Sequence, residues 1–133
     1  MSQTSPATIL LVDDDPAVRE VTAALLEDLG YGVIEADDGA MALDLLSKGT
    51  RVDLMLADFT MPRMTGTELI KEVAICRPGL PVLLVTGYAD ERALEAVGED
   101  RIVLKPFRND ELARKVRVAL GGPDSGKVVT LRR

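Results

Sequence analysis

The sequence predicts an α/β fold in which a parallel β-sheet is covered by helices on both faces. Five short apolar runs alternate with five segments of helical periodicity, and a helix between two strands is the usual crossover that makes them parallel. The first, third and fourth runs are apolar throughout, which is typical of strands buried on both faces. The length of 133 residues is that of a single domain.

Each expected element follows from a local pattern. The strands are expected at Ile9–Val12, Gly32–Ala36, Leu54–Ala57, Val82–Val85 and Ile102–Leu104. The helices are expected at about Pro16–Leu29, Ala40–Ser47, Gly66–Cys76, Asp90–Val97 and 109–120. Residues 1–7 are then an N-terminal arm, residues 8–120 the domain, and residues 121–133 a flexible tail.

Capping residues mark the helix ends. Asp15 is expected to cap the first helix, with Pro16 at its first position and Gly30 after its end. The cap of the fifth helix is expected at Asn109 or Asp110. The apolar stripe of the first helix consists of Val18, Val21, Leu25, Leu26 and Leu29. The inward-facing residues of the second and third helices are Ala42, Leu43, Leu46, Leu69, Ile70 and Val73.

The composition excludes several classes of function. There is no histidine, so a Ser-His-Asp triad or a His-ligated zinc site is excluded. The net charge of −6 disfavours a general nucleic-acid binder, because phosphate contacts need clustered Lys and Arg. Cys76 has no partner for an internal disulfide, and no apolar run reaches the roughly 20 residues of a membrane helix. We expect a soluble, cytoplasmic domain that binds neither nucleic acid nor membrane.

Acidic, hydroxyl and basic residues follow the expected strands. In an open α/β sheet, ligands bind outside the carboxyl ends of the strands. The residues at these positions are Asp13, Asp14 and Asp15 after the first run, Asp58 after the third, Thr86 after the fourth and Lys105 after the fifth. We therefore expect these side chains to meet in one cleft.

This combination favours phosphoryl transfer with an Asp as the nucleophile. Converging carboxylates repel one another, and a hard cation such as Mg²⁺ relieves the repulsion. Lys105 adds a positive charge and Thr86 a hydroxyl donor for a phosphoryl group. A single Asp after a strand is more often a helix cap or loop residue, which is how we interpret Asp15, Asp37 and Asp38. The joint occurrence of all these groups at strand ends favours the chemical interpretation.

Four sequence blocks carry these residues in a fixed order. They are ILLVDDD at 9–15, DLMLADFTMP at 53–62, LLVTG at 83–87 and VLKPF at 103–107. Together they resemble the receiver domain of bacterial two-component response regulators, over about residues 8–120. The resemblance implies a five-stranded parallel sheet with the flavodoxin-like strand order 2-1-3-4-5.

The resemblance also implies a role for each acidic residue. Asp58 looks like the phosphoacceptor. Asp13, Asp14 and Asp58 look like the carboxylates that hold Mg²⁺, with Asp14 the stronger candidate for a direct ligand. The backbone carbonyl of Thr60 would supply a further ligand.

Thr86 and Lys105 resemble the hydroxyl and the cation that bind the phosphoryl group in this family. The resemblance implies that Thr86 is also a switch residue, whose hydroxyl swings towards the phosphoryl group. The second switch position is Ile102, where the family commonly has Tyr or Phe. An aromatic ring turning inward is therefore not expected at that position.

The implied function is a signalling module that accepts a phosphoryl group from a histidine kinase or phosphotransfer protein. It is not an enzyme with a separate turnover substrate, since it only phosphorylates itself and slowly loses the phosphate. It is expected to be a stand-alone regulator or the receiver of a hybrid kinase. The face of the fourth helix, fifth strand and fifth helix commonly mediates contacts in this family, and a homodimer through it is one expectation.

Three alternatives stay open at this point. A metal-dependent phosphatase of the haloacid dehalogenase type would use the Asp-x-Asp pattern of Asp13 and Asp15, but Lys105 is followed by Pro106 rather than by the further acidic residues it needs. A receiver-like interaction domain that is never phosphorylated would not need the complete set of site residues. A flavodoxin-like flavin binder would need a phosphate-binding loop after the first strand, and none is visible.

Overall fold

The computed structural model describes residues 6–59, 66–87, 95 and 97–122. The strands are β1 (Thr8–Val12), β2 (Gly32–Ala36), β3 (Leu54–Asp58), β4 (Val82–Thr86) and β5 (Ile102–Leu104). The helices are α1 (Pro16–Asp28), α2 (Gly39–Ser47), α3 (Gly66–Cys76) and α5 (Asn109–Ala119), with a short 3₁₀ helix, η1 (Glu99–Arg101), before β5. The expected helix Asp90–Val97 lies outside the described residues except at Glu95 and Val97.

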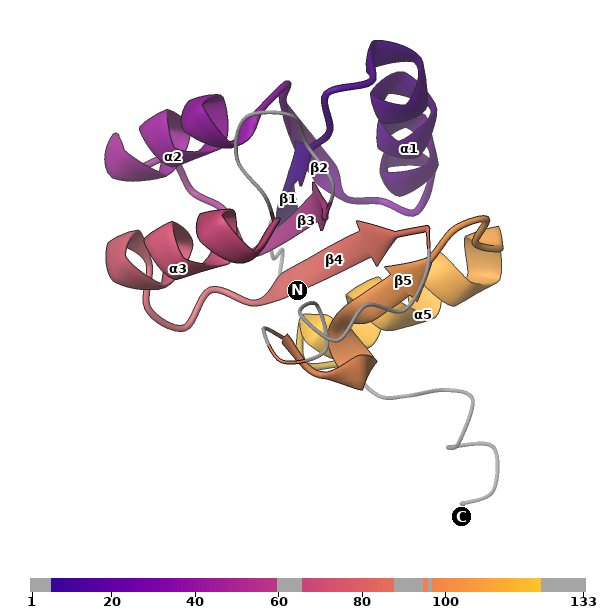
Figure 1. Cartoon of the computed structure of the whole chain (residues 1–133). Helices are drawn as coiled ribbons and strands as arrows, with labels where there is room; N and C mark the ends of the chain where they lie inside the picture. The colour runs from indigo at the N-terminus through magenta and orange to yellow at the C-terminus, as the bar shows by residue number, and fades with distance from the viewer. Residues whose placement is uncertain (1–5, 60–65, 88–94, 96, 123–133) are drawn as a thin grey trace, which may run out of the picture.

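The five strands form one parallel sheet in the order β2-β1-β3-β4-β5 (Figure 1). This confirms the predicted fold class. The pairing aligns the carboxyl ends of the three central strands, since Val12 lies opposite Ala57 and Asp58 lies opposite Val85. The residues that follow these strands therefore emerge at one edge of the sheet.

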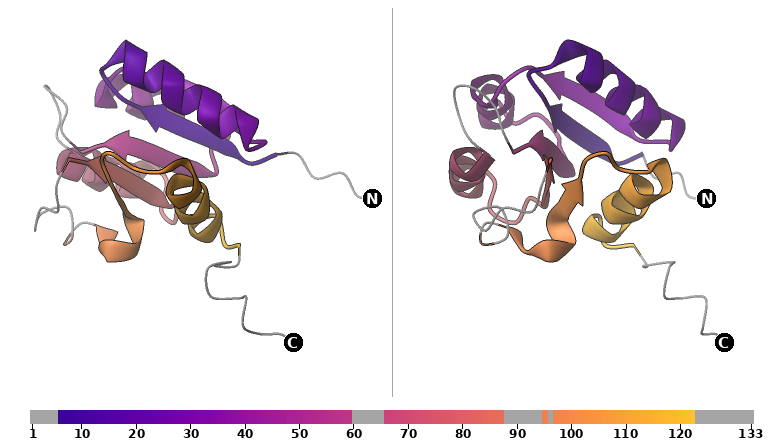
Figure 2. Two further views of the ribbon diagram at one scale, coloured as in Figure 1. Left: turned by 90° about the vertical axis from the view of Figure 1, so that its right-hand side faces the viewer. Right: turned by 45° about the vertical axis from the view of Figure 1, so that its right-hand side comes forward.

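Helices cover both faces of the sheet (Figure 2), and alternate residues of each strand contribute to two separate cores. On one face, residues such as Leu10 and Met55 pack with α2 and α3. On the other face, residues such as Ile9 and Leu56 pack with α1 and α5. β3 and β4 are buried at every position, and β1 is buried from its second residue, which explains why their sequences show no polar alternation.

The predicted apolar face of α1 was wrong in part. The residues that α1 buries against the sheet are Thr22, Ala23 and Leu26. Three members of the predicted stripe are exposed instead: Val18, Leu29 and, with 71% of its surface accessible, Val21. Small side chains at the contact allow the helix to approach the sheet closely, and a stripe chosen for large apolar residues misses them.

The predicted cap of α5 was also wrong. The N-cap residue is Arg108, which makes no side-chain capping bond, and Asn109 is already helical. Asp110 lies in the first turn, where its negative charge favours the helix N-terminus, and it pairs with Arg108 at 3.2 Å.

The expected inward residues of α2 and α3 are confirmed, because all of them are buried or packed against the core. Within the described residues, no helix is long and apolar enough to span a membrane.

The cap of α2 offers a test of the local structure. Asp38 accepts the backbone N–H of Met41 at 2.8 Å, so Asp38→Ala should lower the free energy of unfolding by about 1 kcal/mol. Asp37→Ala is the matched control, because Asp37 is exposed and precedes the cap. Urea unfolding measures both, and equal effects of the two substitutions would contradict the capping role.

Candidate functional site

Three carboxylates meet at the carboxyl edge of the sheet. One carboxylate oxygen from each of Asp13, Asp14 and Asp58 can be chosen so that all three lie within 4.8 Å of one another. Asp13 and Asp14 leave β1, and Asp58 is the last residue of β3. Strands β1 and β3 are neighbours in the sheet, so their ends bring together residues that are 44 or 45 positions apart. The sequence-based expectation of an acidic cluster is thus met.

A basic side chain also lies close to Asp58. The Lys105 Nζ is 3.8 Å from Oδ2 of Asp58, and 37% of the lysine side chain is exposed against 11% of the aspartate side chain. Lys105 follows β5, and its backbone N–H donates to the carbonyl of Thr86 at 2.8 Å. The Lys105–Pro106 peptide bond is cis. Asp58 therefore lies close both to two other carboxylates and to an ammonium group.

Thr86 and Ile102 lie on the two strands beyond Asp58. Thr86 is the last residue of β4 and is buried, with 2% of its surface exposed. Ile102 is the first residue of β5, lies opposite Leu84 and is buried in the core that faces α2 and α3. Thr60, the expected carbonyl ligand, lies outside the described residues.

The loop after β1 is held by several hydrogen bonds. Asp13 donates its backbone N–H to the carbonyl of Ala36 at 3.1 Å and accepts the N–H of Asp15 on its carboxylate at 2.9 Å. Asp15 caps α1, because its carboxylate accepts the N–H groups of Ala17 and Val18. The interpretation of Asp15 as a cap is confirmed, and the structure commits its carboxylate to that role.

Burial disfavours the charged form of the Asp13 carboxylate. Burial raises the pKa of Asp13 above its ordinary value of 3.8, and the negative charges of Asp58 and Asp14 act in the same direction. The N–H of Asp15 and the ammonium group of Lys105 act against this and lower the pKa. The balance is an upward shift, so the folded protein resists the ionisation of Asp13.

Sequence reasoning missed one residue beside this cluster. Arg19 donates from Nη1 to the carbonyl oxygen of Asp13 at 2.7 Å. The available signal was its position four residues after the cap Asp15, one helical turn away, from which a long guanidinium side chain reaches back to the loop.

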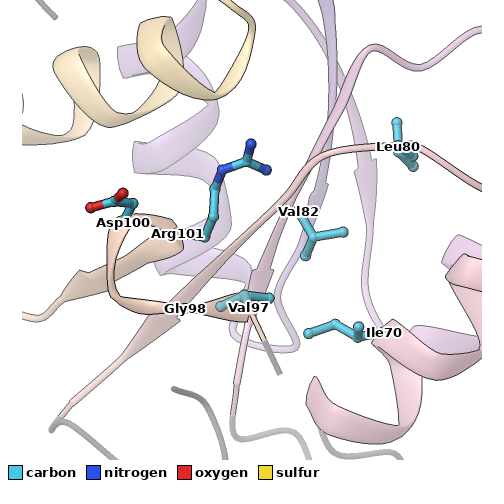
Figure 3. Close-up of a pocket in the computed structure, with 7 residues that line it drawn as sticks. All are labelled: Ile70, Leu80, Val82, Val97, Gly98, Asp100 and Arg101. Carbon is cyan, nitrogen blue, oxygen red and sulfur yellow. The ribbon is translucent and has the colours of Figure 1, made fainter. Parts of the chain in front are cut away.

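A separate hollow lies between α3, the start of β4 and η1, away from the carboxylates (Figure 3). Its volume is about 600 Å³, and the described residues that line it are Ile70, Leu80, Val82, Val97, Gly98, Asp100 and Arg101. Four apolar side chains, those of Ile70, Leu80, Val82 and Val97, line it together with the polar groups of Asp100 and Arg101, which lie at one end (Figure 3). It therefore lacks the converging carboxylates, hydroxyl and cation that support phosphoryl chemistry.

Comparison with known proteins gives one consistent result. The response regulator receiver domain model matches residues 9–117. The chain is 39% identical over 127 residues to the response regulator MprA of Mycobacterium sp. (strain KMS), covering 91% of this chain and 54% of that protein. It is 36% identical over 122 residues to the sensor kinase CckA of Brucella abortus (strain 2308), covering 89% of this chain and 13% of the kinase. The chain thus spans about half or less of the length of these relatives.

A solved structure agrees in fold. The receiver domain of the sensor histidine kinase PA1611 from Pseudomonas aeruginosa PAO1 superposes with a TM-score of 0.79 at 30% identity, covering 88% of this chain and 99% of that one. That structure has a magnesium ion coordinated in its active-site cleft. The family model matches more than three quarters of the 133 residues of this chain. The chain therefore belongs to the response regulator receiver domain family.

Proposed function

We propose that this receiver domain is a phosphoacceptor module in which Asp58 takes a phosphoryl group from a histidine kinase or phosphotransfer protein. The observation that carries the proposal is that Asp58 lies beside the carboxylates of Asp13 and Asp14 and also pairs with the ammonium group of Lys105. A nucleophilic carboxylate needs positive charge beside it when a negatively charged phosphoryl group approaches. Asp58 is the carboxylate of the cluster with that arrangement.

The proposed transfer is a displacement at phosphorus. A carboxylate oxygen of Asp58 forms the new P–O bond, the P–N bond of a phosphohistidine breaks, and the leaving imidazole takes a proton from solvent. The 133 residues contain no histidine, so the donor must lie outside them. The domain then has no separate turnover substrate, and its chemistry is limited to its own phosphorylation and slow dephosphorylation.

Lys105 and Thr86 are proposed to bind the transferred group. The lysine ammonium balances charge on the phosphoryl oxygens, and the buried Thr86 hydroxyl donates a hydrogen bond to one of them. Thr86 lies at the end of β4, which pairs with β5, so a movement of Thr86 would change the packing of its side chain against β5. Ile102 is buried at the start of that strand, which supports a switch through apolar repacking rather than through an aromatic ring.

The residues of the cluster fit a bound Mg²⁺. Mg²⁺ prefers oxygen ligands, and Asp13, Asp14 and Asp58 offer carboxylate oxygens within 4.8 Å of one another. Burial is the main cause of the raised pKa of Asp13, and the charges of Asp58 and Asp14 add to it; a dication beside these carboxylates would relieve their repulsion. When bound, the ion supplies positive charge for the phosphoryl oxygens. The contribution of the Thr60 carbonyl remains a prediction.

The proposed setting is cytoplasmic signalling, either as a stand-alone regulator or as the receiver of a hybrid kinase. The relative named as a sensor kinase supports the second arrangement, and the relative named as a response regulator, of which this chain covers 54%, supports a receiver within a longer regulator. The face that includes β5 and α5 is the proposed site of partner contacts, including contacts between copies of the chain. The expected lack of nucleic-acid binding stays a prediction from the net charge of −6.

Asp58→Asn should abolish phosphorylation by a small donor such as phosphoramidate in the presence of Mg²⁺. The neutral amide of asparagine lacks the negatively charged oxygen that attacks phosphorus. Intact-mass spectrometry should show one added phosphoryl group on the wild type and none on the variant. Asp44→Asn is the matched control, since it removes an exposed carboxylate that pairs with Lys48 on α2. Phosphorylation of Asp58→Asn at the level of the wild type would refute the assignment.

The same assay separates the receiver from a haloacid dehalogenase-type phosphatase. That enzyme would hydrolyse many equivalents of a phosphomonoester, whereas the receiver should accept about one phosphoryl group per chain. The structure gives a reason to expect the second result. The Asp-x-Asp pattern of such an enzyme would need Asp15 for chemistry, but this carboxylate caps α1.

Asp13→Asn should stabilise the metal-free protein increasingly as the pH rises. Because the pKa of Asp13 is raised on folding, the stability it contributes is fully present below its ordinary value of 3.8 and is lost as the pH passes the folded value. The asparagine oxygen can still accept the N–H of Asp15, so the cap region is retained. Urea unfolding of both proteins from about pH 3.5 to 7 measures the difference. A difference that does not change with pH would contradict this electrostatic account, and added Mg²⁺ should reduce it.

A further inference from the structure

Arg19 joins three parts of the structure next to the acidic cluster. From α1 its Nη1 donates to the carbonyl oxygen of Asp13 at 2.7 Å, and its Nε pairs with Oε1 of Glu35 on β2 at 3.0 Å. Only 18% of the Arg19 side chain is exposed, against 45% for Glu35. The two contacts use different nitrogens of one planar group, so the guanidinium has a defined orientation.

The carbonyl that Arg19 contacts belongs to the peptide group that joins Asp13 to Asp14. The pairing of β1 with β2 and β3 ends at Val12, so this carbonyl lies one residue beyond the paired part of β1. Asp13 is buried, with 7% of its surface exposed, and a carbonyl in such a place needs a hydrogen-bond donor. The direction of this peptide group determines where the backbone of Asp14 begins, and therefore where the Asp14 carboxylate lies relative to Asp58.

We propose that Arg19 is a positioning residue for the cation site. It holds the Asp13–Asp14 peptide group so that both carboxylates lie beside Asp58, and Glu35 holds Arg19 in place. This inference rests on the proposed function, since it assumes that the cluster binds Mg²⁺. Partners that orient metal ligands from outside commonly have large effects on metal affinity.

Whether removal of Arg19 weakens or strengthens Mg²⁺ binding distinguishes a positioning role from a purely electrostatic one. Arg19 carries a positive charge close to a site for a dication. If it acted only through that charge, its removal would leave Glu35 unpaired, make the region more negative and strengthen Mg²⁺ binding. If it acts by positioning, its removal weakens Mg²⁺ binding. The two accounts predict opposite results for the same variant.

The test is calorimetric titration of the unphosphorylated protein with Mg²⁺. Arg19→Met should raise the dissociation constant about tenfold, the lower end of the range for such outer partners. Arg19→Lys keeps the charge but has a single head group, so it cannot maintain both contacts and should also weaken binding. Arg51→Met is the matched control, because Arg51 forms a similar ion pair with Asp53 at the opposite end of β3. This control should leave the dissociation constant unchanged.

Melting temperatures without Mg²⁺ separate positioning from general damage to the fold. A lower melting temperature with unchanged Mg²⁺ affinity in Arg19→Met would mean that the contact is only structural, and would overturn the inference. Tighter binding in Arg19→Met, or unchanged binding in Arg19→Lys, would also overturn it in favour of simple charge. Absence of Mg²⁺ binding in the wild type would instead refute the proposed function, and the inference with it.

Discussion

The concentration of negative charge at one edge of the sheet is the constraint on which the site depends. Asp13, Asp14 and Asp58 lie close together, and burial resists the ionisation of Asp13. The mutual repulsion of these carboxylates opposes folding, and the ammonium group of Lys105, 3.8 Å from Asp58, offsets part of it. The same excess of negative charge is what a cation would relieve in the proposed function, and the ammonium group of Lys105 supplies the positive charge that an approaching phosphoryl group requires.

The rigidity of the sheet is what keeps these charges together. Asp58 ends β3, Asp13 and Asp14 directly follow β1, and Lys105 directly follows β5, so the positions of the strands bring these groups to the same edge of the sheet. The strands that carry the carboxylates are buried by helices on both faces, through two cores built from alternate residues. Close-packed cores resist local movement, and the electrostatic cost at the edge is offset by apolar burial beneath it.

Much of this arrangement could be predicted from local sequence pattern. Each strand was expected within one residue of its observed ends, and this alone was enough to place Asp58, Thr86 and Lys105 at one edge. The strand order came from the family resemblance, because periodicity does not specify which strands are neighbours. The exposed Val21 shows that helix faces depend on the close approach of small residues, which a search for large apolar residues overlooks. The contact of Arg19 with Glu35 was not predictable from spacing, because Glu35 lies on β2, whereas the contact with the loop had a signal in the one-turn spacing from Asp15.

Direct titration of the apo protein with Mg²⁺, comparing the wild type with Asp14→Asn, tests the central claim that the carboxylates form one cation site. Asp14 is exposed, so its substitution disturbs the core little while removing a charge and a candidate ligand. The account predicts one Mg²⁺ per chain in the wild type and an affinity that is severalfold lower in Asp14→Asn. The exposed helix variant Asp44→Asn should bind as the wild type does. Equal Mg²⁺ affinity in the wild type and Asp14→Asn would contradict the account.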